Sequence, residues 1–207
     1  MLDLLFTNPA AFVVIFGGII IAIGIHEFAH CFMADRLGDP TPRSMGRLTL
    51  NPLAHLDPLG TLMILITGLF GWGKPSPFDP YNLKHPKKDT AVIALAGPVS
   101  NLILAALLSL ILRTASLPQN VGLIVFGLLT LNVNLALFNL LPVPPLDGSK
   151  ILGVFLTNEQ ALRLSSFAGR NSFLLLFLFI LPLFAGRSLA YLLVSPVSQL
   201  LINLLLP

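Results

Sequence analysis

Two histidines and a glutamate stand together in His26-Glu27-Phe28-Ala29-His30, near the end of a long apolar run. On a helix, His26 and His30 lie one turn apart on one face, where two imidazoles can bind one zinc ion. Glu27 lies beside that face and can take a proton from a water whose pKa the zinc has lowered. The spacing therefore indicates attack of an activated water on a carbonyl group.

The alternative interpretation of this motif is a pair of structural histidines beside a helical glutamate. That alternative weakens inside a membrane helix, where ionisable groups are costly and usually mark a functional site. His26 lies nine residues before Asp35, the first charged residue after the motif, which is on the order of 13 Å along a helix. A metal bound here would lie inside the bilayer.

Catalytic zinc usually has three protein ligands, and Asp147 is the best candidate for the third. It is the only acidic residue between Asp89 and Glu159. Three prolines between positions 142 and 145 prevent a continuous helix before it, so the chain can turn its carboxylate back towards the core. An ordinary Asp-Gly turn at a helix exit is the competing interpretation. Asp147 and the two histidines are expected at the same, cytoplasmic end of their helices.

Several asparagines also lie in apolar spans. For Asn101 and Asn132 the default interpretation is helix packing through amide groups. Asn139 lies eight residues before Asp147, at the edge of the proline-rich stretch, where its amide could bind a substrate carbonyl or oxyanion. Helix packing is the alternative there too.

Three further residues have a functional and a structural interpretation. His55 and Asp57 are candidate accessory ligands, although a capped turn at the membrane surface explains them better. The single cysteine, Cys31, excludes an intramolecular disulfide and is best explained as a small buried core residue.

The composition is that of an integral membrane protein. Of the 207 residues, 55% are hydrophobic and only 10% charged, well below the roughly 25% typical of soluble domains. A separate soluble domain is therefore excluded. The net charge of +3 does not indicate nucleic-acid binding, because the basic residues lie in short segments between apolar runs without interleaved aromatics.

Uncharged runs predict the membrane spans. The N-terminus carries no Lys or Arg, so the first run is expected to be retained as a helix. The predicted spans are Leu4 to Ile25, Ala91 to Leu112, Val121 to Leu141, Phe173 to Ala185 and Leu189 to Leu206. The segment from Asp35 to Asp89 contains an apolar run, Leu59 to Trp72, rich in Gly and flanked by Pro. That composition suits strands, a re-entrant loop or a short hairpin of helices.

The basic residues predict the orientation if the segment from Asp35 to Asp89 crosses the membrane an even number of times. Ten of the 12 then fall on one side, and only Arg113 and Arg187 fall on the other. The ten are Arg36, Arg43, Arg47, Lys74, Lys84, Lys87, Lys88, Lys150, Arg163 and Arg170. By the positive-inside rule that side is cytoplasmic and the N-terminus is outside. A single crossing by Leu59 to Trp72 would largely remove this asymmetry.

Five blocks of sequence resemble the site-2 proteases, which are intramembrane zinc metallopeptidases, in their short prokaryotic form. The blocks are HEFAH, GRLTLNPLAHLDPLGTL (46–62), FGWGKPSPFDP (70–80), ALAGPVSNLILA (94–105) and NLLPVPPLDG (139–148). HExxH alone is a weak signal, but together with a downstream LDG inside apolar spans it is highly specific. The resemblance covers about residues 20 to 155, and the last two spans carry no matching motif.

The resemblance implies one zinc ion per chain held by His26, His30 and Asp147, with Glu27 as general base. It implies a three-helix catalytic core with membrane-associated β structure between the first two core helices. The LTLNP stretch, or its neighbours, is then a candidate strand that pairs with an unwound substrate by β-addition. Unlike longer relatives, the chain is expected to lack a PDZ or CBS domain.

The expected fold is an all-α membrane bundle of about five to six transmembrane helices with a small β or re-entrant element. One integral membrane peptidase domain is expected over 1–207, with a catalytic core at about 5–155 and C-terminal helices at about 172–206. We expect it in the cell membrane, with an active site that opens towards the cytoplasm.

The expected activity is hydrolysis of peptide bonds in or near transmembrane segments of membrane proteins. The alternative is a membrane metal transporter or metal sensor, but that function needs ligands spread across the bilayer depth, and here they gather at one end. A proteolytically silent scaffold is disfavoured by the complete ligand set. The partners are a transmembrane substrate and lipid, not nucleic acid, and a homo-oligomer is left open.

Overall fold

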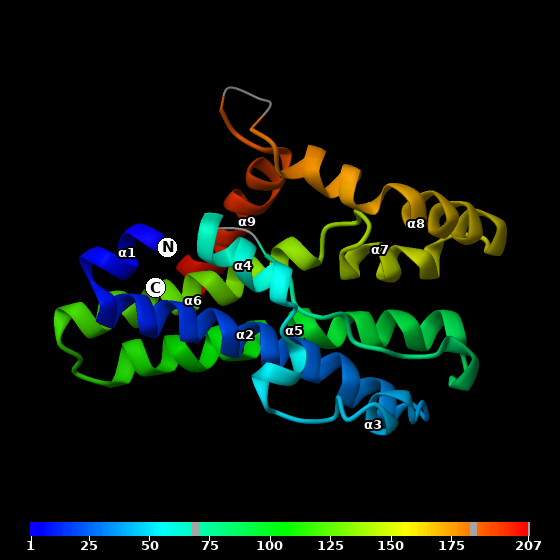
Figure 1. Cartoon of the computed structure of the whole chain (residues 1–207), viewed down its shortest axis with the longest axis horizontal. Coiled ribbons are helices and arrows are strands. Elements are labelled where there is room, and N and C mark those ends of the chain that lie inside the picture. Colours follow the sequence, from blue (N-terminus) through cyan, green and yellow to red (C-terminus); the bar gives the residue numbers. More distant parts are fainter. Residues whose placement is uncertain (68–70, 183–185, 207) are drawn as a thin grey trace.

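The computed structural model describes residues 1–67, 71–182 and 186–206, and its core consists of three long apolar helices. These are α2 (Pro9–Arg36), α5 (Pro86–Thr114) and α6 (Gln119–Asn139), each long and apolar enough to cross a membrane. They lie side by side along the long axis of the molecule (Figure 1) and pack against one another. The chain is therefore a helical membrane protein, as its composition predicts.

The first core helix begins later and runs further than the predicted span from Leu4 to Ile25. A short helix, α1 (Leu2–Thr7), precedes it, and the chain breaks at Asn8, whose side chain accepts the backbone N–H of Ala11. Pro9 then occupies the first position of α2, where its missing N–H costs nothing. The helix continues through the HEFAH motif because no residue there interrupts its backbone hydrogen bonds.

Between α2 and α5 the described residues form short helices and turns. The elements are α3 (Thr41–Ser44), η1 (Pro52–His55), α4 (Pro58–Thr67) and η2 (Pro80–Asn82). An isolated antiparallel bridge joins Leu56 to Gly73, so the chain returns to its starting point around α4. A Cβ at Gly60 would collide with the backbone of Trp72, which explains glycine at that close approach. Residues 68–70 of the predicted run from Leu59 to Trp72 lie outside the described residues.

The predicted strand at LTLNP is not formed in the structure. Thr49 Oγ1 accepts the backbone N–H of Asn51, and the Asn51 side chain accepts that of Leu53. Pro52 then opens η1. These side-chain bonds satisfy the backbone locally and favour turns over a ladder. The described residues of this region contain only the one isolated bridge, so a larger β element has no support in them.

Asp39 ties the C-terminal end of α2 to the segment that leads into α5. Its buried carboxylate accepts hydrogen bonds from Thr41, from the backbone N–H of Asp79 and from the Asn82 amide, at 2.6 to 3.1 Å. Burial opposes its ionisation, but these hydrogen bonds outweigh burial and hold the pKa of Asp39 below its usual value. The carboxylate therefore contributes to stability as an anion.

After α6 the chain forms two short helices and two longer ones. They are α7 (Asp147–Leu152), η3 (Gly153–Phe155), α8 (Asn158–Ile180) and α9 (Leu189–Leu205). The helix α8 begins 15 residues before the predicted Phe173, because Thr157 and Gln160 form a capping box at its start. The end of that predicted span, residues 183–185, lies outside the described residues. The α9 helix packs against α6.

Both chain termini lie towards the same end of the three-helix core (Figure 1). Ser109, near the last turn of α5, donates a hydrogen bond of 2.7 Å to the carbonyl of Leu205 in α9. The C-terminus is thus held near the α5 to α6 connection.

Candidate active site

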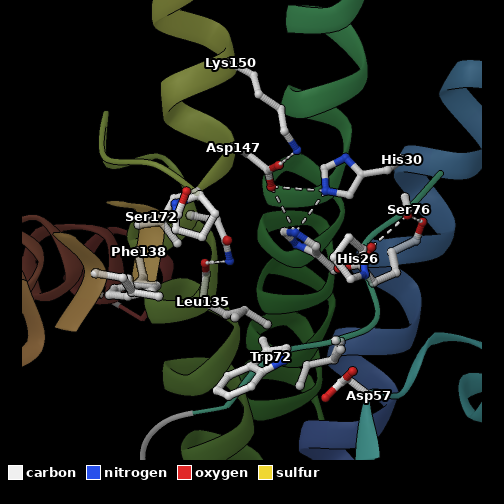
Figure 2. Close-up of a pocket in the computed structure, with 18 of the residues that line it drawn as sticks. His26, His30, Asp57, Trp72, Ser76, Leu135, Phe138, Asp147, Lys150 and Ser172 are labelled. Carbon is white, nitrogen blue, oxygen red and sulfur yellow. Dashed lines mark hydrogen bonds and ion pairs between the residues drawn. The ribbon is translucent and has the colours of Figure 1, made fainter. Parts of the chain in front are cut away.

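Two helices bring three candidate metal ligands to one point. His26 and His30 lie one turn apart on α2, and Asp147 is the first residue of α7. The two Nε2 atoms are 3.1 Å apart, and Asp147 Oδ2 lies 3.2 Å from His26 Nε2 and 3.1 Å from His30 Nε2. All three side chains are nearly inaccessible to solvent, and Figure 2 shows them pointing toward one another.

The proton of the His26 ring is placed by an asparagine on α5. The Asn101 amide approaches the carbonyl of Ala22, which can only accept, so its NH2 group must face that carbonyl. The same NH2 group donates to Asn132 Oδ1 at 3.0 Å. Asn101 Oδ1 therefore faces His26 Nδ1, at 2.6 Å, and accepts its proton. Nε2 of His26 is left free to act as a ligand.

The His30 ring is oriented in the same way by a backbone carbonyl. Its Nδ1 donates to the carbonyl of Ile93 on α5 at 2.7 Å. Pro98 lies within this helix. Because proline has no N–H, the carbonyl of Ala94, next to Ile93, lacks its usual helical donor. Both imidazoles thus direct Nε2 toward the carboxylate of Asp147, and in the neutral ring this nitrogen is the free lone pair.

The three ligand atoms fit a zinc ion. Two imidazole lone pairs and a carboxylate oxygen meet at one point, where they would repel one another without a cation. Ligands about 2.0–2.1 Å from a tetrahedral zinc lie about 3.3–3.4 Å apart, close to the distances found here. A Cβ at Gly97 would collide with Nε2 of both histidines, so glycine leaves the space that the rings occupy. Among the described residues this is the one group of ligand-type side chains that could hold a metal.

Asp147 reaches the histidines because the chain unwinds after α6. That helix ends at Asn139, and residues 140–146 are not helical, as the prolines predict. Gly148 packs so closely on the carbonyls of Leu140 and Leu141 that a Cβ would collide with both. Lys150 Nζ contacts the other carboxylate oxygen, Oδ1, at 3.1 Å. Asp147 therefore offers Oδ2 alone to the metal position.

Glu27 and Asn139 line the same cavity as the three ligands. The cavity has a volume of about 600 Å³ and lies between α2, the segment 71–78, the end of α6 and α8. The Glu27 carboxylate accepts a hydrogen bond of 2.7 Å from Ser76. The Asn139 amide donates to the carbonyl of Leu135 at 2.9 Å.

Comparison with known proteins identifies the family. The sequence model of peptidase family M50 matches residues 114–183. YwhC of Bacillus subtilis is 38% identical over 174 residues, which cover 80% of this chain and 79% of that protein. Rip2 of Mycolicibacterium smegmatis is 35% identical over 156 residues, 72% of this chain and 59% of that protein. Both bear names that assign them to the zinc metalloproteases. No solved structure matches the chain.

The chain belongs to peptidase family M50. It is a zinc metallopeptidase of the site-2 protease type, as the resemblance of its motifs predicts, and its function is intramembrane proteolysis. A transporter or sensor role is not favoured, because the relatives that cover most of the chain are named for proteolysis.

Two of the accessory residues of this M50 peptidase serve its fold. Asp57 Oδ1 accepts the backbone N–H of Gly60 at 2.8 Å and so caps the start of α4, although it also lines the cavity. His55 is fully buried, and its Nε2 donates to the carbonyl of Thr49 at 2.8 Å. The interpretation as a capped turn is confirmed, and Cys31 is fully buried as predicted.

Sequence reasoning missed three residues of the M50 site. The Asn101 amide does join neighbouring helices, through Ala22 and Asn132, as predicted, but the bond between its oxygen and the His26 ring was not predicted. Ser76 contacts Glu27, and Lys150 contacts Asp147. Two signals were available, since Asn101 is a polar group in an uncharged span and Lys150 lies three residues after Asp147. Ser76 has no comparable signal in the sequence.

Proposed function

We propose that His26, His30 and Asp147 hold one zinc ion per chain and that Glu27 is the general base for hydrolysis of peptide bonds in or near transmembrane segments. The observation that carries this assignment is the meeting of the two Nε2 atoms and Asp147 Oδ2 at distances of 3.1 to 3.2 Å. The cavity beside them, of about 600 Å³, has room for a short length of polypeptide.

Each residue has a defined part in the reaction. Bound zinc lowers the pKa of a water and polarises the scissile carbonyl. Glu27 takes the proton of the attacking water and passes it to the leaving amine. Asn139 lines the cavity and keeps a second amide hydrogen beyond the one that Leu135 accepts, so it is a candidate donor to the substrate carbonyl or its oxyanion.

The proposed substrate is a transmembrane helix that unwinds locally. Helical backbone is protected by its own hydrogen bonds, so the scissile segment must be extended, as Gly, Pro or Asn favour. The chain from Gly71 to Asp79 forms no helix or turn and contributes Trp72, Gly73 and Ser76 to the cavity wall. Its backbone is the neighbour of LTLNP that can pair with such a substrate by β-addition.

The proposed orientation is N-terminus outside, in the cell membrane, with the active site open to the cytoplasm. The α4 helix has 10 residues, roughly 15 Å, and is too short to cross a hydrocarbon core of about 30 Å. The bridge between Leu56 and Gly73 places the two ends of the segment that contains α4 at the same depth. Both features support an even number of crossings there, which places ten of the 12 basic residues inside.

The number of spans and the assembly stay predictions. The three core helices are long and apolar enough to span the membrane, and α8 and α9 are the candidates for the other two of the five predicted spans. A homo-oligomer stays open, and a single domain from 1 to 207 is consistent with one helical core.

The test is Glu27→Gln beside Glu159→Gln in detergent-purified protein. Glu159 is an exposed residue that pairs with Arg163 and serves as the matched control. We expect Glu27→Gln to abolish cleavage of a generic transmembrane substrate while zinc content stays at the wild-type level. Glu159→Gln should cleave normally. Full activity of Glu27→Gln would refute the mechanism.

A further inference from the structure

Ser76 lies in the wall of the cavity against the proposed general base. Its Oγ is 2.7 Å from Glu27 Oε2 and 2.8 Å from the Glu27 backbone carbonyl. The thiol of Cys31 donates to the same oxygen at 3.3 Å. Figure 2 shows Ser76 beside α2.

The hydrogen bonds around this hydroxyl favour the carboxylate as its acceptor. Cys31 uses the Ser76 oxygen as an acceptor, which leaves the single O–H of Ser76 to donate. The Glu27 carbonyl lies inside α2, where the helix already supplies it with an N–H donor. An ionised carboxylate is the stronger acceptor of the two. The Ser76 proton therefore goes chiefly to Glu27 Oε2.

The backbone of Ser76 is held rigidly in place. Pro75 and Pro77 flank it, and a proline restricts both its own φ and the conformation of the residue before it. The buried guanidinium of Arg47 donates to the carbonyls of Lys74 and Pro75, at 2.6 and 3.3 Å. Little further conformational entropy is therefore lost when the Ser76 hydroxyl binds a partner.

A further hydrogen bond fixes the same segment, residues 74–76, to the turn before α4. The Lys74 N–H donates to the carbonyl of His55 at 2.7 Å, beside the bridge between Leu56 and Gly73. The rigid segment therefore presents one hydroxyl to a glutamate with three rotatable side-chain bonds. A general base must be held within about 0.5 Å of its productive position.

We propose that Ser76 is a positioning residue that restricts the Glu27 carboxylate to the side of the cavity where it serves as the base. This inference rests on the proposed function, because it assigns a partner to the base named there. Ser76 contacts neither a metal ligand nor the metal position in the described hydrogen bonds. Its removal should therefore slow the chemical step without weakening zinc binding.

The test compares Ser76→Ala and Ser76→Thr with wild type in proteoliposomes that contain a generic transmembrane substrate. Loss of one hydrogen bond to a charged group predicts a fall in kcat of about tenfold for Ser76→Ala. KM and zinc per chain should stay within about twofold of wild type, whereas a purely structural role would change them too. Ser76→Thr keeps a hydroxyl on an extended backbone that suits threonine, and it should restore most of kcat.

Ser109→Ala is the matched control, because it removes a buried hydroxyl bonded to a backbone carbonyl outside the cavity. It should lower thermal stability at most and leave kcat unchanged. A wild-type kcat in Ser76→Ala, a parallel loss of zinc, or no recovery in Ser76→Thr would overturn the inference about Ser76. A wild-type protein without chelator-sensitive cleavage, or an active Glu27→Gln, would instead refute the proposed function.

Discussion

Replacement of Asn101 by alanine should weaken zinc binding even though Asn101 is not a ligand. Its Oδ1 accepts the His26 Nδ1 proton at 2.6 Å and so fixes both the tautomer and the direction of the ring. In Asn101→Ala the ring can rotate and can carry its proton on Nε2. Zinc must then displace that proton and reorder the ring before it binds.

The expected size of the effect follows from what the substitution removes. Loss of a partner that orients a metal-binding histidine typically costs 10 to 100-fold in metal affinity, and we expect a change in that range. The same substitution leaves Asn132 Oδ1 without its Asn101 donor in a buried site. An unsatisfied buried acceptor costs about 1–3 kcal/mol, so thermal stability should fall as well.

The assay is competition for zinc with a chelator of known affinity, on detergent-purified protein checked by size-exclusion chromatography. Ser109→Ala is the control, because it removes a buried interhelical hydrogen bond on the same helix but outside the cavity. It should lose stability and keep its zinc affinity. An unchanged zinc Kd in Asn101→Ala would refute the reasoning that Asn101 sets the His26 tautomer.

Two further predictions concern the space for the ligands and the end of α2. Gly97→Ala should abolish zinc binding, because its Cβ would collide with Nε2 of both histidines. The control is Gly122→Ala, whose Cβ would have nothing within 4 Å, and it should bind zinc normally. Equal zinc content in the two variants would contradict this prediction. Asp39→Asn should lower the free energy of unfolding at pH 7 by about 1–3 kcal/mol, and the apparent Tm with it, because the pKa of Asp39 is lowered in the folded state. That stabilisation is fully present above the ordinary value of 3.8 and is lost as pH falls through the lower folded-state pKa, so the Tm difference between Asp39→Asn and wild type should shrink in acid; a difference independent of pH would count against the account.

The proposed metal ligands could be identified as candidates because their signals are strong in the sequence. His26 and His30 are local, since an i, i+4 spacing fixes two side chains on one helical face whatever the rest of the fold does. Asp147 is distant, but it is the only acid in a long apolar stretch and follows a proline-broken helix end. Scarcity of charge in a membrane protein makes each ionisable residue informative.

The partners of those ligands could not be predicted, because they depend on which helices meet and at what depth. Asn101 is 75 residues from His26, and its pattern alone is equally typical of helix packing. Ser76 lies in a segment without helical or strand periodicity, so the surrounding sequence does not predict that it lies beside Glu27. LTLNP forms turns in the structure because local Asn and Thr side-chain bonds compete with strand pairing, which residue type alone does not decide. Its pairing with a substrate stays a prediction.

The ends of the helices followed capping residues rather than apolar composition. The break at Asn8 and Pro9 moved the start of the first span, and the capping box at Thr157 moved the start of α8. Both are recognisable signals that a search for uncharged runs passes over.

The most direct test of the account is the zinc content of purified wild type beside His26→Ala and Asp147→Ala. The account predicts about one zinc per chain in wild type, loss of zinc in both variants and loss of chelator-sensitive cleavage with it. That result would join two motifs 121 residues apart in a single site. Zinc retained at the wild-type level by Asp147→Ala would contradict the assignment of the third ligand.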